Sequence, residues 1–229
     1  MLGSSAWVEQ DRASRLRWLR ECRRLRNKDR FEQRGGAFPW VAGVDEVGRG
    51  ALAGPVVSAA VILPMGTLIF GLRDSKKLSA KQRTECYQDI VRHALAIGVA
   101  RQDAHVIDAN GIRWATFASM RCALDRLPIR PTEVLVDGRD TIPGLQLAQR
   151  AVIGGDGRSN AIAAASIVAK VVRDLIMIHL HDFYPHYAFA NNKGYGTLPH
   201  RNALASFGVS SVHRRTFLKM LDSGQTAFF

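Results

Sequence analysis

The sequence predicts an α/β fold in which short, buried strands are covered by helices. Short apolar runs alternate along the chain with longer segments of helical periodicity, which is typical of that class. Hydrophobic residues make up 47% of the chain, enough for a substantial core. The length of 229 residues suits one compact domain with a small appendage.

Apolar runs bounded by glycine, proline or polar residues predict the strands. The run 40–44 (WVAGV) predicts the first, and the almost entirely apolar run 56–63 is typical of a strand buried on both faces. Further strands are expected at 94–100, 133–136 and 147–153. In sheets of this class, functional residues gather at strand ends and in the loops that follow.

Helical periodicity predicts the remaining elements. Helices are expected at 79–93, at 107–127 where Pro128 stops the pattern, from residue 160 until Tyr184, and within 206–222 after a loop. Functional side chains are therefore sought at the ends of the strands rather than along these helices.

Residues 1–37 are predicted to form a basic helical extension ahead of a main domain at 38–229. Among many arginines, apolar side chains such as Leu16, Trp18 and Leu19 recur at roughly helical spacing. The extension either contacts a phosphate backbone or lies on the domain with its arginines solvated. The second is the more usual arrangement for a run of charges and is favoured.

The charge balance indicates a polyanionic partner. Lys and Arg number 32 against 20 Asp and Glu, giving a formal net charge of +12. A protein this basic usually meets nucleic acid, although charge does not separate an enzyme from a structural binder.

Cysteine usage and hydropathy indicate the compartment. Cys22, Cys86 and Cys122 are scattered without CxxC spacing, which argues against a disulfide framework or a zinc ribbon and fits a reducing compartment. The start has no apolar signal region, and no apolar stretch is long enough for a bilayer. A soluble, cytoplasmic protein without a membrane partner is expected.

Four acidic residues follow apolar strands and are the candidates for chemistry: Asp45, Glu46, Asp137 and Asp156. Carboxylates in such settings are costly unless they are solvated, paired or bound to metal. When several converge, their repulsion raises pKa values, and a divalent cation relieves it. Oxygen ligands without nearby His or Cys favour Mg²⁺ or Mn²⁺, and two such ions support phosphodiester hydrolysis.

Each acid also has a simpler interpretation. Side chains of Asp45 and Glu46 point to opposite faces of a regular strand, so they share a site only if the strand ends or bends there. The glycines that follow favour a bend. Asp137 and Asp156 each precede a glycine, an ordinary turn signal. Spacing alone leaves the metal site and the turns both open.

Several segments, taken in order, carry a resemblance to a known family. They are 44–57 (VDEVGRGALAGPVV), 74–79 (DSKKLS), 134–138 (VLVDG), 163–174 (AAASIVAKVVRD), 193–197 (KGYGT) and 213–217 (HRRTF). Over about residues 41–221 the chain closely resembles ribonuclease HII. The resemblance implies a ribonuclease-H-like fold: a mixed five-stranded sheet flanked by helices, with a C-terminal helical portion.

The resemblance also implies an activity. It indicates an endonuclease that hydrolyses the RNA strand of RNA–DNA hybrids and cuts 5′ of ribonucleotides embedded in duplex DNA. Two Mn²⁺ or Mg²⁺ ions would assist, leaving a 3′-hydroxyl and a 5′-phosphate. The implied roles are ribonucleotide excision repair and hybrid degradation, by a monomer whose catalytic domain is 38–229.

The implied catalytic and metal-binding residues are Asp45, Glu46, Asp137 and Asp156. The family usually has Lys-Gly-Asp where this chain has Gly154, Gly155 and Asp156, so the acid is retained and a nearby positive charge is missing. Asp174 is a competing fourth acid, for which an ion pair with Arg173 or Lys170 is the favoured role.

The substrate-binding residues implied by the resemblance are Gly48, Arg49, Gly50, Tyr195, Lys76 and Lys170. The Gly-Arg-Gly backbone and Tyr195 would sense the 2′-hydroxyl, which distinguishes RNA from DNA. Lys76, Lys77, Lys170, Lys193, Arg214 and Arg215 are candidate phosphate contacts. His213 either assists proton transfer or packs at a helix start.

Two rival functions are kept. Ribonuclease HIII usually carries a longer N-terminal domain than the residues 1–37 present here. A non-catalytic binder of hybrids or duplexes would gain nothing from clustered acids facing phosphates. Deleting residues 1–37 is expected to weaken binding at moderate salt and to spare the cleavage site.

Overall fold

A mixed five-stranded sheet forms the centre of the protein. The computed structural model describes residues 4–32, 40–72 and 78–222. The strands are β1 (Val41–Val47), β2 (Val56–Ile62), β3 (Ala96–Gln102), β4 (Glu133–Asp137) and β5 (Ala148–Val152), in the order β3-β2-β1-β4-β5. β1 and β3 run antiparallel to β2, whereas β4 runs parallel to both β1 and β5. The predicted mixed sheet is confirmed.

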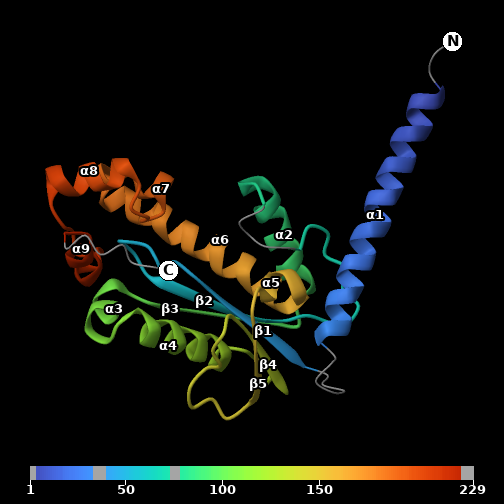
Figure 1. Ribbon diagram of the computed structural model, residues 1–229, viewed down its shortest axis with the longest axis horizontal. Coiled ribbons are helices and arrows are strands. Elements are labelled where there is room, and N and C mark those ends of the chain that lie inside the picture. The colour runs from blue at the N-terminus through green and yellow to red at the C-terminus, as the bar shows by residue number, and fades with distance from the viewer. Residues whose placement is uncertain (1–3, 33–39, 73–77, 223–229) are drawn as a thin grey trace.

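Helices cover both faces of the sheet (Figure 1). They are α1 (Ser4–Glu32), α2 (Ala80–His93), α3 (Ala104–Asn110), α4 (Ile112–Asp125), α5 (Gly155–Arg158), α6 (Asn160–Phe183), η3 (Pro185–Tyr187), α7 (Phe189–Asn192), α8 (Leu198–Phe207) and α9 (Arg215–Asp222). One core layer joins α2 and α6 to the sheet, and a second joins α4 to the opposite face. None of the helices within the described ranges is long and apolar enough to cross a membrane.

The first strand is longer than the apolar run that predicts it. The sequence predicts a strand at 40–44, but β1 continues to Val47. Asp45 pairs with Ala59 of β2, and Glu46 pairs with Ser58. The two acids are therefore inside the strand, because pairing with β2 sustains it beyond the last apolar side chain.

The helix predicted at 107–127 is interrupted. Gly111 has a φ of +82°, a left-handed conformation that favours glycine, and separates α3 from α4. The Gly111 N–H still donates to the Ile107 carbonyl, 2.8 Å away, so it closes α3 as α4 begins. The single predicted helix was wrong, because periodicity alone does not show a change of direction at a glycine.

One glycine lets the start of α6 approach the sheet. A Cβ at Gly43 would lie 2.1 Å from both the Ala161 carbonyl carbon and the Ile162 nitrogen, so a larger residue does not fit. This contact fixes α6 against β1, and it brings Ser166 within hydrogen-bonding reach of Asp45.

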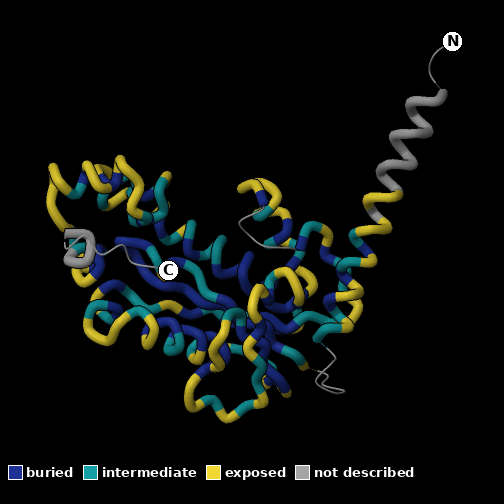
Figure 2. Tube along the Cα trace, in the orientation of Figure 1, coloured by how far each residue is buried: buried dark blue, intermediate teal, exposed yellow. Residues whose placement is uncertain are grey.

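The second half of α1 packs on the domain, and its first half projects outward (Figure 1). Cys22 and Leu25 are buried, whereas Leu16 and Leu19 are exposed (Figure 2). The predicted arrangement on the domain therefore applies to the second half of the helix. The proposed boundary at residue 37 falls within 33–39, outside the described residues.

Replacing Glu32 of α1 with alanine, which has no acceptor oxygen in its side chain, is expected to lower the stability of the whole domain. Glu32 Oε1 accepts hydrogen bonds from the Ser159 hydroxyl (2.7 Å) and the Ala161 N–H (2.8 Å) at the start of α6. Loss of a helix-capping interaction costs about 1 kcal/mol. Urea unfolding would measure this, with exposed Arg23→Gln on the same helix as the control; equal midpoints would contradict the capping role.

Candidate active site

Three acids meet at the ends of two adjacent strands. β1 and β4 are parallel, and Val44 is paired with Val136. The next residue of each strand, Asp45 and Asp137, therefore lies at the same level of the sheet. Asp45 and Asp137 are therefore neighbours across the sheet, and Asp137 also acts electrostatically on Glu46. The predicted metal site itself stays a prediction.

Asp45 and Glu46 lie on opposite faces of β1. Asp45 is only 7% exposed and accepts a hydrogen bond from Ser166 on the α6 side. Glu46 pairs with Ser58, whose hydroxyl is hydrogen-bonded to that of Ser119 in α4. β1 does not need to bend for the acids to interact, because Asp137 on the neighbouring strand acts electrostatically on both.

Burial and mutual repulsion raise the pKa values of both β1 acids. For Asp45, burial raises the pKa well above its usual value, and the charges of Glu46 and Asp137 raise it further. For Glu46, burial raises the pKa, Arg49 opposes the rise and Asp137 adds to it. A divalent cation among these carboxylates would relieve the repulsion.

The carboxylate oxygens of this site are ligands that suit a hard cation. In this structure, however, they do not surround a common point. Asp45, Glu46 and Asp137 offer oxygen ligands only, as Mg²⁺ and Mn²⁺ prefer. Within the described residues, no group of three or more His, Cys, Asp or Glu side chains lies close enough to hold an ion as placed. Glu46 is instead paired with Arg49, at 3.3 Å.

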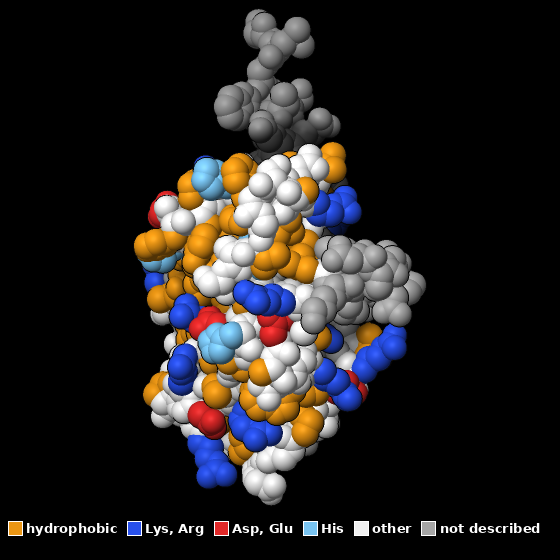
Figure 3. All heavy atoms as spheres, turned by 90° about the vertical axis from the view of Figure 1, so that its left-hand side faces the viewer, with side chains coloured by type: hydrophobic (Ala, Val, Ile, Leu, Met, Phe, Trp, Pro, Cys, Tyr) orange, Lys and Arg blue, Asp and Glu red, His pale blue; other side chains and the backbone are white. Residues whose placement is uncertain are grey.

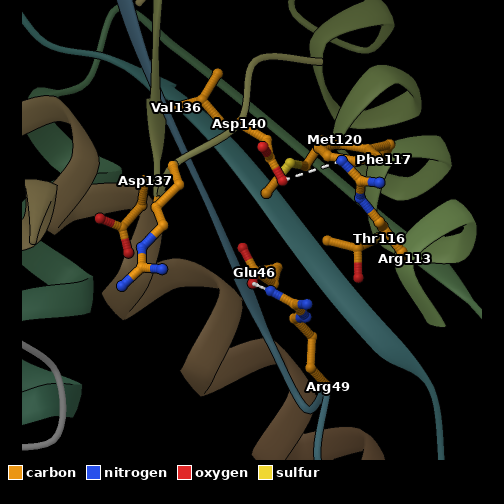
Figure 4. A pocket seen from close by; sticks show the side chains of 11 residues that line it. Glu46, Arg49, Arg113, Thr116, Phe117, Met120, Val136, Asp137 and Asp140 are labelled. Carbon is orange, nitrogen blue, oxygen red and sulfur yellow. Dashed lines mark hydrogen bonds and ion pairs between the residues drawn. The ribbon is translucent and has the colours of Figure 1, made fainter. Parts of the chain in front are cut away.

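A pocket of about 70 Å³ opens beside these acids (Figure 4). It is lined by Glu46, Arg49, Arg113, Thr116, Phe117, Met120, Val136, Asp137, Gly138, Arg139 and Asp140. Arg113 lies 3.2 Å from Asp140, on the opposite side of the pocket from Arg49. Arg113 and Arg139 were missed by sequence reasoning, because no local pattern indicates that they line the same pocket as Glu46 and Asp137.

The basic surface is not confined to this pocket. On the end of the molecule that carries α8 and α9, the Lys and Arg side chains drawn in colour are interspersed with hydrophobic and acidic ones (Figure 3).

Asp156 lies in α5, next to a residue that holds Asp137. The Gly155 N–H donates to Asp137 Oδ1 at 2.7 Å. The main-chain oxygen of Asp156 accepts from Lys28 Nζ at 2.6 Å. A positive charge therefore lies beside Asp156 although position 154 is glycine. Burial and Arg24 lower the pKa of Lys28 to about 8, while Asp156, Glu32 and Glu21 oppose that shift.

A fully buried arginine holds the Gly-Arg-Gly loop. Arg214 has no exposed surface, and its guanidinium donates to the carbonyls of Gly48 (2.7 Å), Arg49 (2.7 Å) and Gly54 (3.0 Å). The prediction that Arg214 contacts phosphate was wrong, because the side chain faces these carbonyls and not solvent. Arg215 is exposed, so its predicted phosphate contact stays a prediction.

A second buried arginine, Arg173, packs against Gly48 and the segment that follows the Gly-Arg-Gly loop. Arg173 donates to the carbonyls of Pro55 and Lys193, each at 2.9 Å. Gly48 has a φ of +88°, and a Cβ there would lie 2.0 Å from Arg173 Nε. Only glycine fits at position 48. The loop backbone there is held by the buried side chains of Arg214 and Arg173.

Tyr195 lies beside the same loop. The N–H groups of Leu52 and Ala53 both donate to the Gly194 carbonyl, at 2.8 and 3.2 Å. The Arg173 guanidinium lies 5.3 Å from the centre of the Tyr195 ring, which is partly exposed. Tyr195 therefore follows a residue that is hydrogen-bonded to the segment just after the Gly-Arg-Gly loop. Its role in sensing the 2′-hydroxyl stays a prediction.

The remaining candidates differ in their surroundings. Lys170 forms an ion pair with Asp174 at 2.7 Å, which is the structural role favoured for Asp174. Lys193 donates to the Ala190 carbonyl. Lys76 and Lys77 lie outside the described residues, so their predicted phosphate contacts are not placed.

His213 has a packing role. It is 2% exposed, its Nε2 lies 3.0 Å from that of His200, and its Nδ1 lies 2.7 Å from the Ser210 hydroxyl. Burial and the neighbouring His200 lower its pKa to about 4. Of the two roles considered for His213, packing at a helix start is the one its surroundings support.

A mixed sheet that brings acids together at adjacent strand ends, beside an arginine-lined pocket, is the arrangement of a nuclease of the ribonuclease-H-like class. Comparison with known families agrees. The Ribonuclease HII model matches residues 42–220, and the chain belongs to this family. The family makes it a ribonuclease H, a hydrolase that acts as an endonuclease.

Individual relatives show the extent of the likeness. Ribonuclease HII of Enterococcus faecalis is 49% identical over 182 residues, covering 80% of this chain and 71% of the relative. That of Geotalea daltonii is 51% identical over 177 residues, covering 77% and 82%. Among solved structures, ribonuclease H2 from Pyrococcus horikoshii OT3 superposes with a TM-score of 0.68 at 24% identity, over 82% of this chain and 100% of that one.

Proposed function

We propose that the protein hydrolyses the RNA strand of RNA–DNA hybrids and cuts duplex DNA on the 5′ side of an embedded ribonucleotide. The products are a 3′-hydroxyl and a 5′-phosphate. The observation that carries the mechanism is the group of buried, mutually repelling acids at the ends of β1 and β4. A divalent cation bound between these carboxylates would offset their electrostatic repulsion.

Asp45, Glu46 and Asp137 would hold two Mg²⁺ or Mn²⁺ ions, and Asp156 would complete the site. Ions held by these residues would supply activation of a water for attack on a phosphodiester and stabilisation of the leaving oxygen. For Glu46 to serve as a ligand, its ion pair with Arg49 must open. Arg49 is then free to contact a phosphate of the incoming strand.

The Gly-Arg-Gly loop and Tyr195 would select the ribonucleotide. Arg214 engages the Gly48 and Arg49 carbonyls from inside the protein, and Arg173 lies against Gly48, which leaves the opposite side of the backbone for the sugar. The absence of side chains at the glycines permits a close approach to a 2′-hydroxyl. The partly exposed Tyr195 ring would pack on the adjacent sugar.

Phosphate contacts are proposed for two groups of residues. Arg49, Arg113 and Arg139 line the pocket beside the acids, and Lys76 and Lys170 come from the sequence motifs. For Lys170, the contact requires its pair with Asp174 to rearrange. A cytoplasmic location and a monomeric state are likewise proposed for this chain.

Cleavage of a DNA duplex carrying one ribonucleotide is the direct test. The wild-type protein with Mn²⁺ or Mg²⁺ is expected to make a single cut 5′ of that ribonucleotide and none in an all-DNA duplex. Because the reaction needs the metal, excess EDTA should stop it. Gel analysis of labelled strands measures this, and tight binding without a cut in either metal would identify a non-catalytic binder.

A further inference from the structure

Lys28 is a buried lysine whose ammonium reaches the site from the N-terminal helix. It is 3% exposed, and its Nζ lies 2.6 Å from the Asp156 oxygen and 3.3 Å from the Leu72 oxygen. Lysines are almost never buried this completely unless their ammonium is paired. Since the ammonium points into the protein, Lys28 is not a phosphate contact.

The helix around Lys28 is fixed against the start of α6, which directly follows α5. One turn before it, the Leu25 carbonyl accepts a hydrogen bond from Asn160 Nδ2 at 3.1 Å. One residue after it, Asp29 Oδ1 accepts from the same amide at 2.8 Å. Further along, Glu32 caps the start of α6. The position of the Lys28 ammonium is therefore set by several contacts of α1, not by its own bonds alone.

The segment that carries Asp156 has few anchors of its own. α5 is a single turn, entered through Gly154 with a φ of +62° and containing Gly155 and Gly157. On the side of α5 that faces β4, the Gly155 N–H donates a hydrogen bond to Asp137. The Lys28 bond to Asp156 is the corresponding contact on the α1 side.

This contact is a property of the chain outside the shared family region. The family match begins at residue 42, so α1 and Lys28 precede it. The two ends of the contact are 128 residues apart in sequence. A helix with no part in the family signature thus touches the main chain of one of the four proposed metal-site acids.

We propose that Lys28 is a positioning residue of the metal site, which fixes the backbone at Asp156 so that its carboxylate is presented beside Asp137. The proposal rests on the proposed function for the identity of Asp156 as a ligand. It changes the expectation for α1: deleting the extension removes a support of the site and not only a contact to nucleic acid.

Lys28→Met in the full chain is the test, with Arg26→Met on the exposed side of the same helix as the matched control. Methionine keeps an unbranched side chain and removes the ammonium, leaving the Asp156 and Leu72 carbonyls without their partner. Both variants lose one positive charge from α1, so long-range electrostatic effects on a cation are similar in the two.

Three measurements separate positioning from simple stabilisation, all made well below the melting temperature. Amide exchange at 155–159 is expected to become about tenfold faster in Lys28→Met alone. Calorimetric titration of the free protein with Mn²⁺ is expected to show weaker binding, and kcat on the one-ribonucleotide duplex to fall, each by about 10–100-fold. The KM for the duplex should stay within about twofold, since Lys28 does not face the substrate.

Other outcomes overturn the proposal. Exchange at 155–159 and Mn²⁺ binding both equal to those of Arg26→Met would make Lys28 a packing residue only. A changed KM and salt dependence with unchanged exchange would make it a substrate contact. Exchange and metal binding do not involve nucleic acid, so they test Lys28 even if the wild-type protein fails to cut the duplex.

Discussion

Replacing Asp45 with asparagine is expected to abolish cleavage and at the same time to stabilise the metal-free protein. Loss of one preorganised charged group costs about 10²–10³-fold in rate, and a lost metal ligand at least as much. The same change removes a buried charge that Glu46 and Asp137 repel. Each kcal/mol of repulsion removed should raise the melting temperature by about 2–4 °C.

The sign of the pH dependence follows from the direction of the pKa shift. The pKa of Asp45 in the folded protein is raised well above 3.8, the ordinary value of an aspartate in an unfolded chain. Between the two values the folded state binds more protons, so wild-type stability falls as the pH rises through that window. The stability advantage of the Asp45→Asn variant therefore grows as the pH rises through that window and disappears as the pH falls toward 3.8.

Melting curves of both proteins at pH 7 and near pH 4, with and without Mn²⁺, measure this. Added metal should stabilise the wild type more than the variant, because only the wild type retains all the ligands. Asp125→Asn, an exposed acid at the end of α4, is the control and should change neither activity nor stability. A metal-free Asp45→Asn protein that melts below the wild type at pH 7 would show that the surroundings of Asp45 do not destabilise its negative charge.

Replacing Arg214 with methionine is expected to lower both stability and activity on a ribonucleotide substrate. The carbonyls of Gly48, Arg49 and Gly54 lose their hydrogen bonds from Arg214, and Gly48 keeps only a long one from the Ala51 N–H. The loss of these bonds costs roughly 3 kcal/mol or more, a fall of roughly 6–12 °C in melting temperature. A loop displaced by about 1 Å would reduce kcat/KM on the one-ribonucleotide duplex by about 10²-fold.

Two further variants separate geometry from charge. Arg214→Lys retains the charge but lacks the planar fork that reaches all three carbonyls, so it should recover only a small part of the activity. Arg215→Met removes the neighbouring exposed arginine and should leave the melting temperature nearly unchanged. Full activity of Arg214→Lys would mean that the charge, and not the set of hydrogen bonds, holds the loop.

The positions of the strands were largely predictable because apolar runs of residues fix them, although β5 is mostly not buried. The exceptions occur where the determining contact is distant. β1 extends through Asp45 and Glu46 because β2 pairs with them, and no local feature of two adjacent acids indicates a strand. The helix at 107–127 divides at Gly111, where the backbone conformation rather than the periodicity decides.

The acids of the site were predictable because each follows an apolar run, and their convergence follows from the sheet order. The basic residues were not. Arg214 is one of two adjacent arginines, and only the fold shows that it is buried while Arg215 is exposed. Lys28 is one of many basic residues in α1, and its partner Asp156 is distant in sequence. Hydrophobic periodicity carries no information about such pairs.

The reach of Arg214 back to the Gly-Arg-Gly loop has a consequence for synthesis of the chain. Arg214 and Gly48 are 166 residues apart, so the loop is made early on the ribosome and its anchor emerges last. Domains begin to fold as they are synthesised, N-terminal parts first. The nascent sheet can therefore form while the Gly-Arg-Gly loop, which we propose selects the ribonucleotide, still lacks its support. A translation product that stops before residue 214 would have the acids in place and no ordered means of choosing where to cut.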